Sequence, residues 1–219
     1  MVEKIKNETH GQAKSRAREE LIYEARIVKK LGDHPGVPLV FGICSRAVPF
    51  CIVIQFHGDR KELKSLTIQR ALAEKTISDK ATWMDVIRKF AKAIIHVHEV
   101  GFLHNDIKSN NVILNTMDKI SYNSVIIDFG KSLPMSGLKG PKVLSKEKQE
   151  KYRKKFPHIA PEIVSGKRGQ SIKSDIYSLG QIVNSIFVKA KLGPVPKVIC
   201  QTLKDNQEDR PNLEVITAI

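Results

Sequence analysis

The sequence predicts an α+β fold in which a small first part, made of one helix and two strands, precedes a larger and mainly helical part. Residues 13–31 carry apolar side chains at helical spacing, and two short apolar, β-rich runs follow at 39–44 and 48–56. Residues 58–60 (Gly-Asp-Arg) break the pattern, and helical periodicity dominates from residue 62 onward. The chain is therefore expected to form two lobes with a hinge near residue 58.

The first predicted helix ends at a glycine and is followed by a turn. Its apolar face is formed by Leu21, Ala25, Val28 and Leu31. Gly32 supplies a stop signal, and residues 33–36 (Asp-His-Pro-Gly) have the composition of a loop. Because only residues 45–47 separate the two β-rich runs, we expect these runs to pair as antiparallel strands.

The second part contains two strong helical patterns. Residues 83–100 and 176–188 each carry an apolar stripe at helical spacing, and Gly101 follows the first of them as a stop. Between these helices, the short apolar runs 112–114 and 125–127 are expected to form buried strands joined by a polar stretch.

The remaining segments carry weaker signals. Residues 134–155 are basic and are predicted to be irregular, whereas residues 195–204 and 212–219 are candidates for the last helices.

The composition is that of an ordinary globular protein, with 41% hydrophobic and 27% charged residues among 219. No apolar run approaches the ~18 residues that span a bilayer, so no membrane span is expected. Cys44, Cys51 and Cys200 are spaced neither as a disulfide framework nor as a metal knuckle, which favours a reducing, cytoplasmic location. The net charge of +14 suits an anionic partner, but we assign most of it to exposed lysines and expect no nucleic-acid partner.

Residues 104–111 (His-Asn-Asp-Ile-Lys-Ser-Asn-Asn) lie in a predicted loop between a long helix and a strand, where catalytic groups are often placed. Phosphoryl transfer needs a carboxylate that orients the attacking hydroxyl, a cation near the moving phosphate, and oxygen ligands for Mg²⁺. The octet offers an acid at Asp106, a cation at Lys108 and an amide oxygen at Asn111. Alone, this pattern is also compatible with a polar turn.

A second motif strengthens the interpretation. Residues 128–130 (Asp-Phe-Gly) directly follow the apolar run 125–127, so Asp128 lies at the carboxyl end of a predicted strand. A carboxylate there, followed closely by glycine, is a good metal ligand on a loop that can move. Because this motif lies close to the octet in the sequence, the two motifs together support a phosphoryl-transfer site more strongly than either does alone.

Together with three further motifs, these residues make the chain resemble the protein kinase superfamily over nearly its whole length. Residues 104–111 are similar to the catalytic loop of that family, and residues 128–130 are similar to its magnesium loop. Ala-Pro-Glu at 160–162 matches the end of the activation segment, residues 174–180 match the start of the central buried helix, and residues 209–211 (Asp-Arg-Pro) resemble the stretch that holds a structural arginine.

The resemblance implies a role for each matching residue. Asp106 would be the catalytic base, and Lys108 would contact the γ-phosphate of ATP. Asn111 and Asp128 would hold Mg²⁺. Asp175 would accept hydrogen bonds from the backbone of the catalytic loop.

Other matching residues would be structural. Glu162 and Arg210 would form a buried ion pair, and His104 would pack under Phe129.

The resemblance also implies a lysine–glutamate pair in the first part. Glu24 lies beside the apolar stripe of the first helix, and a buried charge needs a partner. In the family that partner is a lysine on the preceding strand, which contacts the α- and β-phosphates. Lys4 fits this position best, and Lys6 is the alternative.

The adenine site is inferred from the family register alone. Ile54 would be the gatekeeper, and adenine would bond to backbone groups near Gln55, Phe56 and His57. Ile113 would form part of the floor of the pocket.

The family pattern divides the chain into a partial N-terminal lobe, residues 1–57, and a C-terminal lobe, residues 58–219.

The sequence departs from the family pattern in three places. The sequence begins at the lysine strand, so the glycine-rich phosphate loop is expected either to belong to a longer form of the protein or to be lost. Asn105 stands where most members have an arginine that receives an activation-loop phosphate. Arg210 follows Asp175 by only 35 positions, which indicates a shortened end.

The expected function is transfer of the γ-phosphate of ATP, with Mg²⁺ as cofactor, to Ser or Thr hydroxyls of a protein substrate, because Lys108 is more typical of serine/threonine than of tyrosine kinases. The missing phosphate loop favours instead a catalytically impaired kinase that acts as a binding module. A small-molecule phosphotransferase would share the acidic motifs, but the Ala-Pro-Glu motif and Arg210 favour a protein substrate. A polyanion-binding module would rest on net charge alone.

Overall fold

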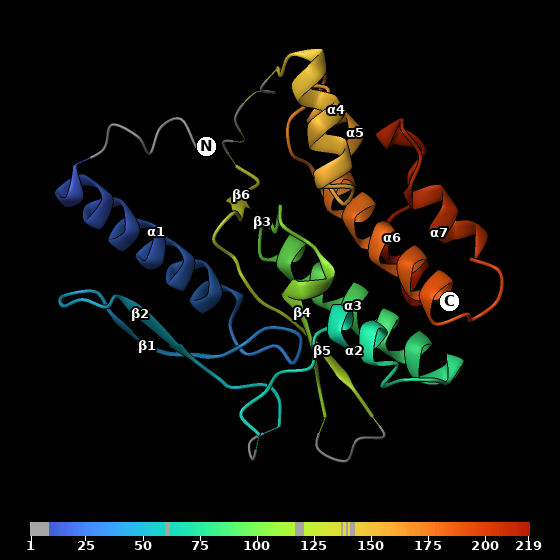
Figure 1. The fold of residues 1–219 in the computed structure, drawn as a ribbon, viewed down its shortest axis with the longest axis horizontal. Coiled ribbons are helices and arrows are strands. Elements are labelled where there is room, and N and C mark those ends of the chain that lie inside the picture. Colours follow the sequence, from blue (N-terminus) through green and yellow to red (C-terminus); the bar gives the residue numbers. More distant parts are fainter. Residues whose placement is uncertain (1–8, 60–61, 117–120, 137, 139, 141–142) are drawn as a thin grey trace.

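The computed structural model describes residues 9–59, 62–116, 121–136, 138, 140 and 143–219. The fold is α+β, as predicted (Figure 1). The helices are α1 (His10–Leu31), α2 (Ile68–Glu74), α3 (Lys80–Glu99), α4 (Lys146–Lys155), α5 (Pro161–Val164), α6 (Ile172–Lys189), α7 (Lys197–Thr202) and α8 (Leu213–Thr217). The strands are β1 (Val40–Cys44), β2 (Cys51–Ile54), β3 (Phe102–Leu103), β4 (Val112–Asn115), β5 (Asn123–Ile126) and β6 (Leu133–Pro134).

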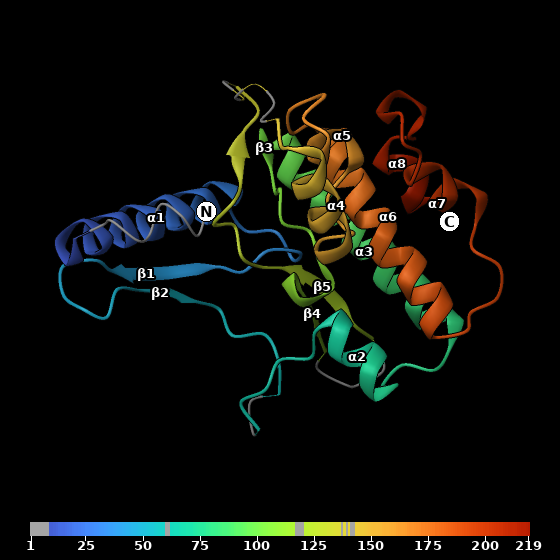
Figure 2. The same cartoon turned by 45° about the horizontal axis from the view of Figure 1, so that its top comes forward.

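The first part of the chain consists of α1 and the β1–β2 hairpin, which lie side by side in Figures 1 and 2. The strands pair antiparallel as predicted, and the register sets Cys44 opposite Cys51. Helix α1 begins one turn earlier than predicted because Thr9 and Gln12 form a capping box that satisfies the first backbone N–H groups.

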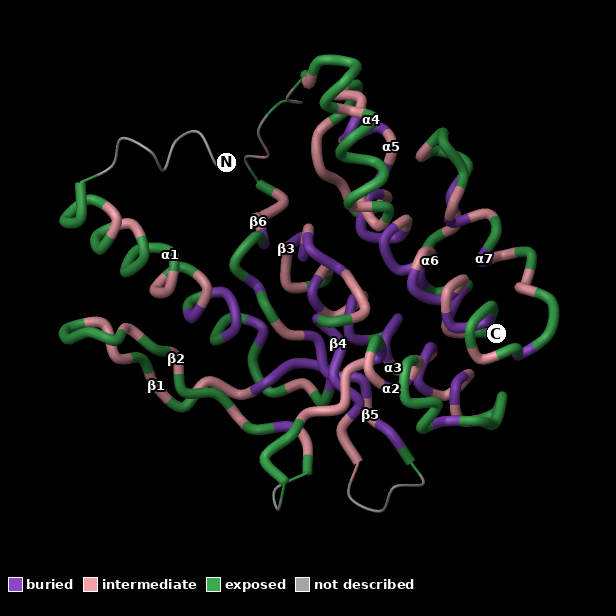
Figure 3. The backbone as a smooth tube through the Cα atoms, in the orientation of Figure 1, coloured by how far each residue is buried: buried purple, intermediate pink, exposed green. Residues whose placement is uncertain are grey.

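The buried core lies in the second part, around α3, α6 and the β4–β5 hairpin (Figure 3). Trp83 on α3 is fully buried, and its indole N–H donates to the Ile77 carbonyl at 3.1 Å. The β4–β5 hairpin packs on α3, where the buried hydroxyl of Ser124 donates to the Val86 carbonyl at 2.9 Å. This packing fixes the two strands beside the predicted catalytic motifs, since β4 directly follows residues 104–111 and β5 precedes residues 128–130.

One prediction was wrong: the basic segment 134–155 is not irregular throughout, because its end forms α4. Ser145 caps this helix by accepting from the Lys148 N–H, and Lys151 pairs with Glu147 one turn away at 2.6 Å. The helix buries no residue, so it has no apolar stripe by which periodicity could reveal it. Its lysine, glutamate, glutamine and arginine content favours helix by intrinsic propensity alone.

In the part of the chain that the structure describes, no helix is both long and apolar enough to cross a membrane.

Candidate active site

The loop that follows β3 contains the predicted catalytic residues and is held by one buried carboxylate. Asp175, in the first turn of α6, accepts the backbone N–H groups of His104 at 2.8 Å and Asn105 at 3.0 Å. His98 on α3 places its Nε2 2.9 Å from the same carboxylate. Asn105 adopts a left-handed conformation, with φ of 62°, which asparagine tolerates better than most residues. The interaction expected for Asp175 is therefore present.

The loop that follows β5 contains the Asp-Phe-Gly motif and is fixed by contacts on two sides. The buried ring of Phe129 packs against His104 with 4.8 Å between ring centroids. Its backbone N–H donates to Oε1 of Glu24 on α1 at 3.1 Å. Asp128 itself has a φ of 67°, a left-handed conformation that turns the chain sharply at the end of the strand. The loop therefore joins α1 to the catalytic loop.

Asp106 is only 3% exposed and has three basic side chains near its carboxylate. Lys108 Nζ lies 2.8 Å from Oδ2, and Lys131 Nζ lies 2.8 Å from Oδ1. His158 Nε2 is 3.9 Å from Oδ1. Burial alone would raise the pKa of Asp106, but His158, Lys108 and Lys131 outweigh it and hold this pKa far below its ordinary value. Asp106 is thus an ionised acceptor in this structure.

Two of these neighbours were missed by the sequence reasoning. Lys131 directly follows the Asp-Phe-Gly motif, so its position in the sequence was a usable signal. His158 follows α4 and reaches Asp106 from the activation segment, for which the sequence offers no spacing rule.

Asn111 links the two acidic motifs. Its Nδ2 lies 3.5 Å from Oδ2 of Asp106 and 3.2 Å from Oδ2 of Asp128. Lys108 Nζ is 3.9 Å from the same oxygen of Asp128. The structure therefore brings together the two predicted catalytic residues and the two predicted metal ligands.

The donor set fits Mg²⁺, a hard cation that prefers oxygen ligands and keeps several waters. The Asp128 side chain is 46% exposed, so a carboxylate oxygen is accessible. Asn111 would offer its amide oxygen after a rotation of the amide group that exchanges O and N. No group of three or more His, Cys, Asp or Glu side chains suited to a metal occurs among the described residues. Two protein ligands would thus leave most positions to water and phosphate oxygens.

The predicted lysine partner of Glu24 cannot be placed, because Lys4 and the alternative Lys6 both lie outside the described residues. Burial, followed by the charge of Asp128, raises the pKa of Glu24, and the N–H of Phe129 partly offsets this rise. A carboxylate in this environment would gain from a nearby cation. The Lys4–Glu24 pair stays a prediction.

The predicted adenine-site residues lie at the end of β2 and on β4. Ile54 pairs with Val40, and Gln55 donates its N–H to the Leu39 carbonyl at 2.8 Å, so this N–H is already used within the chain. Phe56 is 44% exposed, His57 is buried, and buried Ile113 pairs with Val125. Their role in binding adenine stays a prediction.

His57 provides a testable pH effect on stability. Both of its ring nitrogens are buried without a hydrogen-bond partner among the described residues, and burial lowers its pKa. Below the ordinary histidine pKa of about 6.5, the unfolded chain therefore binds more protons than the folded chain, and the free energy of unfolding falls as the pH drops through that value.

The slope of unfolding free energy against pH between 5 and 7, measured by urea denaturation, should be smaller in His57→Phe. It should not vanish, since burial also lowers the pKa of His34 and His104. An unchanged slope would contradict the assignment.

The predicted ion pair between Glu162 and Arg210 is confirmed. Arg210 donates two hydrogen bonds to the Glu162 carboxylate, at 2.8 and 2.7 Å, and both side chains are buried. This pair joins the Ala-Pro-Glu motif of α5 to the segment before α8.

Comparison with known proteins decides the family. The sequence model described as the protein kinase domain matches residues 2–216. This chain belongs to the protein kinase domain family. The motifs that place acidic and amide side chains around one centre in this kinase domain lie within the matched range.

Individual relatives are distant serine/threonine kinases. The kinase domain is 26% identical to the serine/threonine-protein kinase PknD of Chlamydia trachomatis serovar D, over 86% of this chain and 22% of the relative. It is 32% identical to PknD of Chlamydia caviae, over 50% and 12%. It is 30% identical to the serine/threonine-protein kinase GIN4 of Saccharomyces cerevisiae, over 74% and 12%. The matches therefore cover 12–22% of the length of these relatives.

Proposed function

We propose that this kinase domain transfers the γ-phosphate of ATP to serine or threonine hydroxyls of protein substrates. The observation that carries the proposal is the bridge formed by Asn111, whose amide lies within 3.5 Å of both Asp106 and Asp128. The serine/threonine specificity is supported by Lys108 and by the names of the relatives.

In this proposal each side chain would have a separate task. Asp106 would accept a hydrogen bond from the substrate hydroxyl and orient it for attack. Lys108, already 2.8 Å from Asp106, would offset negative charge on the transferred phosphoryl group. Asn111 and Asp128 would hold Mg²⁺, which when bound shields the charge of the phosphates.

A change of partner by Lys131 would favour this chemistry. Its ammonium group occupies Oδ1 of Asp106, and its side chain is 60% exposed, so it can turn away into solvent. Removal of this charge would bring the pKa of Asp106 closer to its ordinary value and make it a stronger hydrogen-bond acceptor.

A catalytically impaired kinase that serves as a binding module is the second candidate. The observation that favours it is the same pair of lysines, because a carboxylate held by Lys108 and Lys131 is a weak base. A phosphotransfer assay on the 219-residue chain separates the two candidates, since Mg·ATP binding without turnover supports the second.

The metal role of Asp128 can be tested by stability. With Mg·ATP at 100 times its dissociation constant, the parent protein should gain about 2.7 kcal/mol in unfolding free energy. Asp128→Asn should lose most of this gain, because the neutral amide binds Mg²⁺ poorly. The matched control is Asp33→Asn, which makes the same change at an exposed loop position and should keep the full gain. Equal gains in both variants would remove Asp128 from the metal site.

The proposal also includes a boundary between the two lobes and a cytoplasmic location. We place the boundary between the lobes at residues 57 and 58, where β2 has ended and the chain passes toward α2. A cytoplasmic location is supported by three cysteines that are all free.

A further inference from the structure

Two cysteines face each other across the β1–β2 hairpin. Cys44 is the last residue of β1, Cys51 is the first residue of β2, and the register sets them directly opposite each other. Side chains at such positions lie on the same face of the sheet, with their Cβ atoms about 4.5–5.5 Å apart. A disulfide needs about 3.5–4.5 Å between Cβ atoms, so a small approach of the two strand ends is enough to join the sulfurs.

Both cysteines are free and open to small reagents. Cys51 is exposed and Cys44 is half-buried. Sγ of Cys44 lies 3.7 Å from the Ala47 carbonyl, a contact in which the thiol is only a weak donor. Little stabilisation is therefore lost when the Cys44 side chain turns toward Cys51.

The hairpin can accommodate this approach. In the part of the chain that the structure describes, β1 and β2 form a sheet of two strands, so no third strand has to move with them. The pair lies beside the loop that joins the strands, and residues 46–49 of this loop are exposed. The strand ends can therefore adjust without disturbing the buried core.

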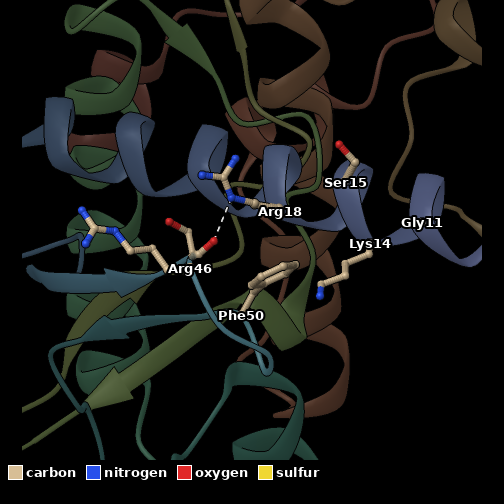
Figure 4. A pocket seen from close by; sticks show the side chains of 7 residues that line it. Gly11, Lys14, Ser15, Arg18, Arg46 and Phe50 are labelled. Atoms are coloured by element: carbon tan, nitrogen blue, oxygen red, sulfur yellow. Dashed lines mark hydrogen bonds between the residues drawn. The ribbon is translucent and has the colours of Figure 1, made fainter.

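Contacts at both ends of the hairpin hold the register of the pair. Nε of Arg18 on α1 donates to the Ser45 carbonyl at 2.7 Å, the contact drawn as a dashed line in Figure 4. At the other end, the Gln55 N–H donates to the Leu39 carbonyl at 2.8 Å. These contacts resist a slip of one strand along the other, which would move the two cysteines to opposite faces of the sheet.

Cys200 is a poor partner for either cysteine within the molecule. It is exposed on α7, which lies on the opposite side of the molecule from β1 and β2 in Figures 1 and 2. A metal site is not indicated, because the described residues contain no group of three or more His, Cys, Asp or Glu side chains suited to one. The chemistry left to Cys44 and Cys51 is reaction with each other.

We propose that Cys44 and Cys51 form a modification site at which a peroxide converts the two thiols into an intramolecular disulfide. The proposal goes beyond the phosphotransfer function and does not depend on it. A dithiol would reverse the reaction, so the site suits a reducing compartment, in which disulfides are usually transient.

The reaction balances with hydrogen peroxide as the oxidant. The thiolate of the more exposed Cys51 attacks one peroxide oxygen, the O–O bond breaks, the sulfur becomes a sulfenic acid, and the other oxygen leaves as water. The thiolate of Cys44 then attacks this sulfur, the S–S bond forms, and the second oxygen leaves as water. Two electrons pass from the thiols to the peroxide, and the two thiol protons end in the two water molecules.

The bond would stiffen the hairpin. It joins the two strands covalently at their loop end, and Ser45, which directly follows Cys44, keeps the loop attached to α1 through Arg18. We expect slower amide hydrogen exchange in β1 and β2 of the oxidised protein than of the reduced protein. Equal exchange in the two forms would refute the stiffening.

Mass spectrometry of the 219-residue chain tests the bond. The reduced protein is treated with hydrogen peroxide, and the remaining thiols are blocked with N-ethylmaleimide. We expect two of the three thiols to be lost and Cys200 alone to be blocked. Trypsin cuts after Arg46, between the two cysteines, so the bond should appear as two peptides joined through sulfur that dithiothreitol separates.

The matched control is Cys200→Ser, which makes the same change at an exposed cysteine outside the hairpin and should keep the bond. Cys44→Ser should lose the bond and leave Cys51 as a sulfenic acid, which dimedone traps. A bond from Cys200 to either hairpin cysteine, a disulfide-linked dimer as the main product, or hairpin thiols that stay free after Cys200 has been oxidised would each overturn the proposal.

Discussion

Asp106→Asn should lower the phosphotransfer rate of this kinase domain by about 10²–10⁴-fold and leave ATP binding intact. The side chain keeps its size, but the amide cannot accept the proton of the substrate hydroxyl. Lys108 and Lys131 each lie 2.8 Å from a carboxylate oxygen, so loss of the negative charge also frees both lysines. The rate constant should be measured at saturating Mg·ATP, alongside the dissociation constant for the nucleotide.

Lys131→Met is the informative companion to this variant. It removes one cation from Asp106 but leaves the proposed base, so its rate should stay far above that of Asp106→Asn. Equal turnover in Asp106→Asn and the parent would contradict the role of the carboxylate. A comparable loss of rate in Lys131→Met would instead assign Lys131 a necessary part in catalysis.

Arg210→Met should reduce the free energy of unfolding by about 3–5 kcal/mol, as expected when one partner of a buried ion pair is removed. Arg210 is 2% exposed, and the change strands the buried Glu162 carboxylate. It also strands the carbonyls of Lys204 and Lys173, to which Arg210 donates at 2.8 and 2.9 Å. Urea denaturation of the variant and the parent measures the difference.

Two further variants keep this prediction testable if Arg210→Met fails to fold. Glu162→Gln retains a hydrogen-bond acceptor, so its loss should be smaller than that of Arg210→Met. The double variant Glu162→Met/Arg210→Met should be less destabilised than the sum of its two single changes, because no lone charge is left behind. Additive losses would show that the pair contributes nothing as a pair.

Elements with a regular apolar spacing were predictable, and the errors in them lie at their ends, whereas α4, which has no apolar stripe, was missed. Helix α3 was expected from residue 83 but begins at Lys80, since Asp79 accepts from the Thr82 N–H at 2.7 Å. Helix α6 likewise begins at Ile172, after a capping box formed by Ser171 and Ser174. Caps are polar and short, so a search for apolar periodicity passes over them.

The candidate site was predictable where one motif supplies several groups. Asp106, Lys108 and Asn111 come from a single octet, and Asp128 follows one hairpin later. His98 and His158 could not be assigned in the same way. They reach Asp175 and Asp106 from distant segments, and such contacts depend on helix packing.

The hydrogen bonds of Asp175 bear on the order in which the molecule acquires its active form. One carboxylate joins backbone groups that precede it by 70 and 71 positions, so the catalytic loop lacks its support until α6 has docked. Such long-range closure is slow to nucleate compared with local helix formation. During synthesis on the ribosome, the side chains of residues 104–111 would therefore emerge well before Asp175 can hold the backbone of their loop in place.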